Sequence, residues 1–173
     1  MNEQKKWLTI KYSLYTVLII LLYVLQSTPG FLVVFDVKPN LAVPAAICIA
    51  MREGEFVGGL YGAFAGVLCD LGGPNIFGLN AIIFLIAGTA AGLLVIYMLR
   101  PGVINFVFLT AGALFTRSLL DYLFHYAMWE YENVWMVLVY HLLPGVLYSA
   151  AVSPLCYFAA NSIYKYFAVK LQR

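Results

Sequence analysis

Apolar residues fill this chain in long runs, which are separated by short stretches of glycine, proline and charged residues. Thr28-Pro29-Gly30, Gly72-Gly73-Pro74 and Arg100-Pro101-Gly102 are the clearest of these breaks, and such clusters mark turns. Most of the runs approach the roughly 20 apolar residues that a helix needs to cross a bilayer. The pattern therefore predicts six transmembrane helices, over residues 8–27, 40–52, 54–71, 76–99, 102–123 and 133–163.

The composition of the chain indicates the same class of protein. Of 173 residues, 64% are hydrophobic and only 10% are charged, whereas about 25% of the residues of a soluble domain are charged. We therefore expect an all-α polytopic membrane protein that forms one transmembrane domain in contact with membrane lipid. The net charge of +2 is too small to indicate a nucleic-acid partner. The first apolar run is longer than the ~7–15 apolar residues of a secretory signal, so we expect it to remain as the first helix.

The lysines and arginines predict the orientation of the bundle, because basic residues concentrate on the cytoplasmic side of a membrane. With both termini in the cytoplasm, eight of the ten basic residues fall on that side. They are Lys5, Lys6, Lys11, Arg52, Arg100, Lys165, Lys170 and Arg173. An even number of spans also returns the chain to the side on which it began. We therefore expect the N- and C-termini to be cytoplasmic.

The second predicted span, residues 40–52, is short. Its 13 residues cover about 20 Å as a helix, which is less than the ~30 Å hydrocarbon core. Pro44 also disturbs a helix that begins at Asn40. A short helix or an irregular segment at membrane depth has to be shielded by neighbouring helices. We therefore expect this segment inside the bundle rather than against lipid.

A strip of glycines marks the third predicted span. Gly58, Gly62 and Gly66 recur every four residues, so they share one face of a helix. Gly88 and Gly92 repeat this spacing in the fourth span. Small residues allow two helix backbones to approach closely in a membrane. Two interpretations follow: close packing of the third span on the fourth, or a docking face for the transmembrane helix of a partner.

Charged residues lie at the end of the third span and within the fifth. Asp70 either caps a turn or the next helix, with Asn75 as a rival cap, or makes a polar contact with a partner at the outer surface. Arg117 and Asp121 are one helical turn apart, so they can form a polar pair along the helix. Alternatively, Arg117 extends toward the outer surface of the membrane.

The sequence contains no recognisable catalytic or metal-binding motif. GxSxG, HExxH and a glycine-rich phosphate loop followed by lysine are all absent from it. Cys48, Cys69 and Cys156 lack the spacing of a zinc site or of a disulfide framework. We therefore expect no enzymatic activity, no cofactor and no bound metal.

Several short motifs, spread over nearly the whole chain, occur in an order and spacing that resemble the bacterial rod-shape-determining MreD family. The motifs of the first half are Leu25-Gln26-Ser27, Lys38-Pro39-Asn40-Leu41 and Ala50-Met51-Arg52-Glu53-Gly54. The others are the strip from Gly58 to Gly66, Asp70 with Gly78, and Leu143-Pro144-Gly145 with Leu147-Tyr148.

This resemblance implies a non-enzymatic subunit of the cell-elongation complex in the bacterial cytoplasmic membrane. Members of the family associate with MreC, a single-span protein with a part outside the cytoplasm. They act with the actin-like MreB and with the peptidoglycan synthases RodA and a class B penicillin-binding protein. Together with the glycine pattern, the resemblance leads us to expect that Gly58, Gly62, Gly66 and Asp70 hold the transmembrane segment of an MreC-like partner.

The resemblance also implies a six-helix fold shared with the substrate-binding (S) components of energy-coupling-factor vitamin transporters. An S component binds a vitamin in an outward-facing pocket and docks on a transporter subunit, usually through a strip of small residues on its first helix. Residues 8–27 are bulky throughout, and the outer half of the predicted bundle lacks a dense polar set. The scaffold is therefore the favoured function, with the S component as the alternative.

Overall fold

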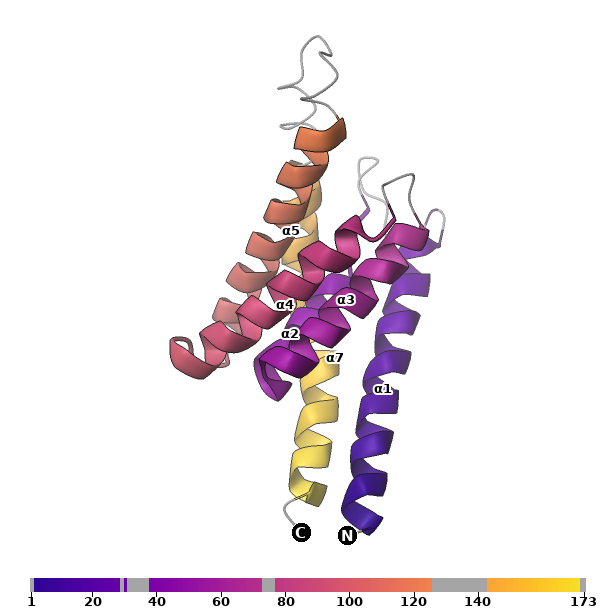
Figure 1. The fold of residues 1–173 in the computed structure, drawn as a ribbon, viewed down its shortest axis with the longest axis vertical. Coiled ribbons are helices and arrows are strands. Elements are labelled where there is room, and N and C mark those ends of the chain that lie inside the picture. The colour runs from indigo at the N-terminus through magenta and orange to yellow at the C-terminus, as the bar shows by residue number, and fades with distance from the viewer. Residues whose placement is uncertain (1, 29, 31–37, 73–76, 126–142, 172–173) are drawn as a thin grey trace.

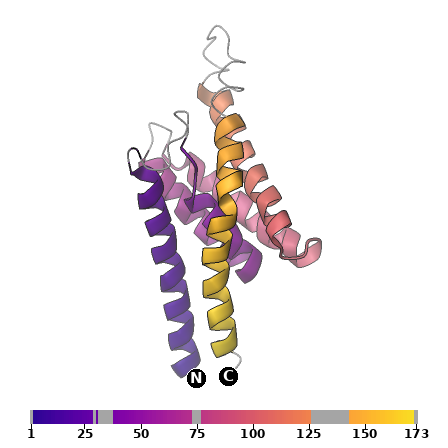
Figure 2. The ribbon, with the colours of Figure 1, turned by 180° about the vertical axis from the view of Figure 1, so that it is seen from behind.

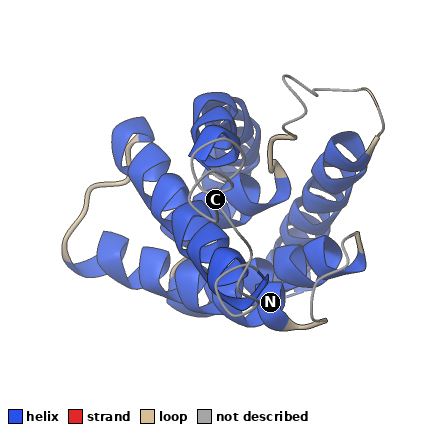
Figure 3. Cartoon of the chain, turned by 90° about the horizontal axis from the view of Figure 1, so that it is seen from above, coloured by secondary structure: helices blue, strands red, loops and turns tan. Residues whose placement is uncertain are grey.

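The computed structural model describes residues 2–28, 30, 38–72, 77–125 and 143–171. All regular structure in these ranges is α-helical (Figure 1; Figure 3). The helices are α1 (Asn2–Ser27), α2 (Ala42–Glu53), α3 (Glu55–Leu71), α4 (Leu79–Tyr97), α5 (Val103–His125) and α7 (Leu143–Leu171). The all-helical fold class is thus confirmed for this part of the chain.

Four of these helices, α1, α4, α5 and α7, are long and apolar enough to cross a membrane. With 12 and 17 residues, α2 and α3 are shorter than the ~20 residues of an upright span. The membrane class is therefore supported, whereas six complete crossings and cytoplasmic termini stay predictions. The start of α1 and the end of α7 lie at the same end of the molecule (Figure 1; Figure 2).

Helices α1 and α7 extend beyond the apolar runs that predicted them. α1 begins at Asn2 rather than near residue 8, and α7 ends at Leu171 rather than near residue 163. Residues 133–142, at the start of the last predicted span, lie outside the described residues. Lysine is a good helix former, and its charged end can reach water from a helix that continues past the apolar core. The added turns contain Lys5, Lys6, Lys165 and Lys170.

The core of the bundle is built around α2, in which every residue from Ala42 to Met51 is buried. α2 contacts α1, α3, α4, α5 and α7, so the expectation that this short segment lies inside the bundle is confirmed. Alanine is its commonest residue, and small side chains allow the surrounding helices to approach closely. Pro44 falls in the first turn, where its missing N–H costs no intrahelical hydrogen bond.

The glycine strip of α3 is the surface on which α4 packs. The two helices run antiparallel (Figure 1). A Cβ atom added at Gly62 would overlap the carbonyl oxygen of Phe84, and one at Gly66 would lie 2.5 Å from the Cα atom of Ala81. A Cβ atom at Gly58 would overlap Ala50 of α2. The strip is therefore filled by neighbouring helices of the same chain, as the packing interpretation predicted.

The partner-docking role that we expected for Gly58, Gly62 and Gly66 does not fit this structure. All three glycines are buried, and a partner helix would have to displace α4 to reach them. Backbone-to-backbone contact in a membrane gains van der Waals energy that larger side chains would prevent. The glycine face of α3 is therefore not free for a partner helix.

The last helix, α7, continues through a proline. Pro154 lacks the N–H that would otherwise bond to the carbonyl oxygen of Ala150. The hydroxyl of Ser153, which is fully buried, donates a hydrogen bond to this same oxygen at 2.7 Å. The carbonyl group that the proline frees is thus satisfied within one turn, and the helix runs on to Leu171.

We expect Gly62→Ala to destabilise the bundle, because its Cβ atom would overlap the backbone of Phe84. Overpacking costs about 1–3 kcal/mol, and a backbone obstacle cannot rotate away. Gly112→Ala in α5 is the matched control, since a Cβ atom there meets nothing within 4 Å. Thermal unfolding in detergent, followed by circular dichroism, should show a lower Tm for Gly62→Ala only. Equal Tm values for the two variants would contradict the packing of α3 on α4.

Candidate functional site

Polar side chains gather at both ends of the buried helix α2, and the first group lies where α2 begins. Gln26 Oε1, from α1, accepts hydrogen bonds from the backbone N–H groups of Leu41 (2.6 Å) and Ala42 (3.2 Å). Asn40, which directly precedes the N-cap residue Leu41, accepts one through its Oδ1 from the N–H of Val43 at 3.1 Å. These bonds satisfy three of the N–H groups that a helix start leaves without intrahelical partners.

Asn40 also ties the start of α2 to the last helix. Its backbone N–H donates to Ser149 Oγ at 2.9 Å, and the Ser149 hydroxyl donates to the carbonyl oxygen of Gly145 at 2.8 Å. Asn40 and Ser149 are 109 residues apart in the sequence. Two segments that contribute to the family resemblance, around Asn40 and around Gly145, are therefore connected in space.

Asp70, which we expected to contact a partner or cap a helix, caps α4. Its carboxylate accepts hydrogen bonds from the N–H groups of Gly78 (3.0 Å), Asn80 (3.3 Å) and Ala81 (3.3 Å), and from Asn80 Nδ2 (2.8 Å). Gly78 has a φ of +94°, a left-handed conformation that favours glycine. Since Asp70 is only 4% exposed and both oxygens are engaged, it is not available to a partner. Its rival cap, Asn75, lies outside the described residues.

Arg117 of α5 extends the same network of hydrogen bonds. Its Nε donates to Asn80 Oδ1 at 2.7 Å, and Asn80 is 2% exposed. Asp70 therefore orients Asn80, which in turn holds Arg117, and this chain of bonds connects α3, α4 and α5. The pair with Asp121 stays a prediction. The role of Asn80 was missed from the sequence, because spacing within one helix does not show contacts with another.

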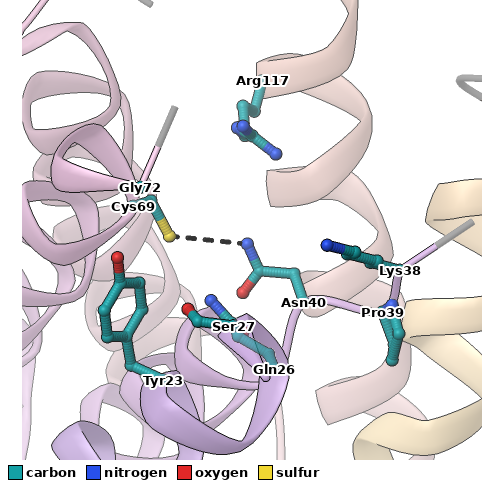
Figure 4. A pocket seen from close by; sticks show the side chains of 9 residues that line it. All are labelled: Tyr23, Gln26, Ser27, Lys38, Pro39, Asn40, Cys69, Gly72 and Arg117. Atoms are coloured by element: carbon teal, nitrogen blue, oxygen red, sulfur yellow. Dashed lines mark hydrogen bonds between the residues drawn. The ribbon is translucent and has the colours of Figure 1, made fainter. Parts of the chain in front are cut away.

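A polar pocket of about 330 Å³ lies beside this network. Figure 4 shows its side chains, which come from α1, α3, α5 and the segment before α2. The lining residues are Tyr23, Gln26, Ser27, Lys38, Pro39, Asn40, Cys69, Gly72 and Arg117. The expectation that this part of the bundle lacks a dense polar set is therefore wrong, since polar residues from distant parts of the sequence meet here.

The second polar group lies where α2 ends. Lys11 of α1 and Glu53 form a buried ion pair with an Nζ–Oε1 distance of 2.6 Å and side-chain exposures of 6% and 9%. The hydroxyl of Tyr15 donates to the same carboxylate oxygen at 2.9 Å. The sequence indicates Lys11 only as one of the basic residues of the cytoplasmic side. The one local signal of this pair is a lysine within an apolar stretch.

Arg52, next to Glu53, is held by aromatic side chains of α7. Its Nη2 donates to the Tyr157 hydroxyl at 2.7 Å. The guanidinium carbon lies 5.8 Å from the ring centre of Tyr157 and 5.4 Å from that of Tyr164, within the range of cation–π attraction. Lys11 Nζ lies 5.2 Å from the Tyr164 ring. Lys11 thus pairs with the carboxylate of Glu53 and Arg52 with the hydroxyl of Tyr157, while the aromatic faces add negative potential beside both cations.

The bonds at the two ends of α2 mainly hold helices together, and the polar pocket is the candidate ligand site. Among the described residues, no group of three or more His, Cys, Asp or Glu side chains is placed to hold a metal ion. Cys48 and Cys156 are free and buried, while Cys69 borders the pocket. Several pocket donors, including the ammonium group of Lys38, face the open space (Figure 4).

No family model, no curated protein and no solved structure matches this chain. Function is therefore inferred from the motifs of its sequence and from the places that the fold gives to their residues.

Glu53→Gln should destabilise the protein strongly, because it leaves the charged Lys11 buried without its carboxylate. Removing one partner of a buried ion pair costs about 3–5 kcal/mol. Adding Lys11→Met removes the uncompensated charge, so the double variant should regain much of the lost stability. Chemical denaturation gives the free energies of unfolding, with Glu55→Gln at the start of α3 as the matched control. A Glu53→Gln variant as stable as the wild type would show that the pair does not stabilise the bundle.

Proposed function

We propose that this chain is a non-enzymatic scaffold subunit of the bacterial cell-elongation machinery, located in the cytoplasmic membrane, and that it binds an MreC-like single-span protein. One observation carries the proposal: the motifs that resemble the MreD family contain residues whose hydrogen bonds connect the helices of the fold. Gln26 holds the start of α2, Asn40 joins it to α7, and Asp70 with Gly78 caps α4. Agreement between a sequence pattern and the three-dimensional role of its residues supports the resemblance.

The same resemblance supplies the other proposed partners. We expect RodA, a class B penicillin-binding protein and MreB to act in the same complex, with the start of α1 and the end of α7 on the cytoplasmic side. Polar side chains at both ends of α2 bond to other parts of the same chain. This arrangement suits a protein that holds partners in a fixed geometry.

A groove between α1 and α3 is the surface that we propose for the partner helix. Its volume is about 460 Å³, and it is lined by Tyr12, Thr16, Phe56, Val57, Leu60, Tyr61 and Phe64. The hydroxyls of Tyr61 and Thr16 donate to the carbonyl oxygen of Tyr12, at 2.8 Å and 3.1 Å. Its polar atoms are thus engaged within the chain, and the rest is an apolar surface suited to a transmembrane helix. The α3 side chains that line it lie on the opposite side of that helix from the glycine strip.

The second candidate function is the substrate-binding component of a vitamin transporter, which the polar pocket favours. Against it, the exposed face of α1 is bulky rather than small, since it carries Leu14, Val17, Leu21 and Val24. Calorimetric titration of the purified chain with water-soluble vitamins separates the two functions. Nanomolar binding of a vitamin would overturn the scaffold proposal.

Leu60→Trp should weaken binding of the MreC-like partner, because the larger side chain would fill the groove. We expect about tenfold weaker binding, equivalent to ~1.4 kcal/mol, when detergent-solubilised variants capture the tagged partner. Leu155→Trp is the matched control: both leucines are exposed, by 56% and 71%, but Leu155 lies on α7 outside the groove. Both variants should keep the wild-type Tm. Equal capture by the two variants would rule out the groove as the partner site.

A further inference from the structure

The polar pocket at the start of α2 carries positive charge without an acidic residue in its lining. Lys38 and Arg117 both line it, and none of the lining residues is Asp or Glu. Figure 4 shows the ammonium group of Lys38 and the guanidinium group of Arg117 directed into the same space from different sides. In the part of the chain that the structure describes, Lys38 takes part in no ion pair. The charge in the pocket therefore favours an anion.

The amide side chains of the pocket present their donor ends. The oxygen of Gln26 is engaged by the N–H groups of Leu41 and Ala42, and the oxygen of Asn40 by the N–H of Val43. The nitrogen of each amide remains as a hydrogen-bond donor on a residue that lines the pocket. Asn40 Nδ2 lies 3.6 Å from the sulfur of Cys69, which is a weak acceptor. Both amides thus add hydrogen-bond donors to the two cations.

Arg117 is fixed in position by a contact outside the pocket. Its Nε donates to Asn80 Oδ1 at 2.7 Å, and Asn80 is itself held by Asp70. The guanidinium group is thereby oriented before any ligand arrives, and a fixed fork of this kind binds the oxygens of an oxyanion well. The start of α2 adds the positive end of a helix dipole beside the pocket.

We propose that this pocket binds a phosphate group, carried either by a lipid head group or by a soluble molecule. Four side chains of the pocket carry hydrogen-bond donors, those of Arg117, Lys38, Gln26 and Asn40. Together they have more donors than the two oxygens of a single carboxylate can accept. The additional oxygens of a phosphate can use them. The hydroxyls of Tyr23 and Ser27, which also line the pocket, add donors at its border. A phosphate ligand and a partner helix would not compete, since the pocket and the groove between α1 and α3 share no lining residue.

Binding to the purified full chain in dodecyl maltoside, a detergent without phosphate, tests this assignment. One calorimetric titration uses inorganic phosphate, and the other uses dihexanoyl phosphatidylglycerol, with the corresponding diacylglycerol as the ligand that lacks the phosphate. The informative variant is Lys38→Gln, because Lys38 is exposed and holds no helix in place. Lys165→Gln is the matched control, because it removes the same charge from an exposed position on α7.

We expect Lys38→Gln to weaken binding about tenfold or more, the effect of losing one charge-assisted contact, and Lys165→Gln to leave it unchanged. Tighter binding of phosphatidylglycerol than of inorganic phosphate, with the same dependence on Lys38, assigns the pocket to a lipid head group. Comparable binding of the two ligands, again dependent on Lys38, assigns it to a soluble phosphate compound. If neither ligand binds, if diacylglycerol binds as well as phosphatidylglycerol, or if Lys38→Gln matches Lys165→Gln, the phosphate site is disproved.

Discussion

A helix that is too short to cross the membrane, α2, lies at the centre of this bundle. The backbone N–H and C=O groups at its two ends therefore need hydrogen-bond partners from the protein itself. Each unpaired backbone group costs several kcal/mol in apolar surroundings without water. At the start of α2, Gln26 and Asn40 take up the free N–H groups. At its end, the N–H of Gly54 returns to the carbonyl oxygen of Ala50 at 3.1 Å, and a φ of +93° at Gly54 turns the chain directly into α3.

This requirement determines where the long helices lie. α1 reaches both ends of α2, through Gln26 at one and Lys11 at the other. α7 does the same through Ser149 and Tyr157. Apolar contacts alone leave helices free to slide along one another in a membrane, whereas paired polar groups specify one register. The contact of α3 with α4 completes the enclosure, because glycine allows the two backbones to touch and Asp70 caps the start of α4.

Local features of the sequence predicted much of the fold, and contacts between distant segments account for the rest. The long apolar runs indicated the helices, and the shortness of residues 40–52 indicated burial. The glycine spacing predicted a close contact but did not name its occupant, since any helix can fill such a strip. The sequence does not predict the contact of Lys11 with Glu53 or that of Asn80 with Arg117. These side chains come from different helices and meet only after the helices have assembled. The polar pocket has the same origin, since its lining comes from separate helices.

Arg52 and Glu53 are neighbours in the chain, yet their partners are synthesised at very different times. Glu53 bonds to Lys11 and Tyr15 of α1, whereas Arg52 bonds to Tyr157 of α7. Because synthesis proceeds from the N-terminus, the carboxylate can be paired as soon as α2 has formed. The guanidinium group of Arg52 gains its partner, Tyr157, only after α7 has been synthesised. Until α7 has been made, Arg52 therefore lacks both the hydrogen bond and the aromatic faces that hold it in the complete bundle.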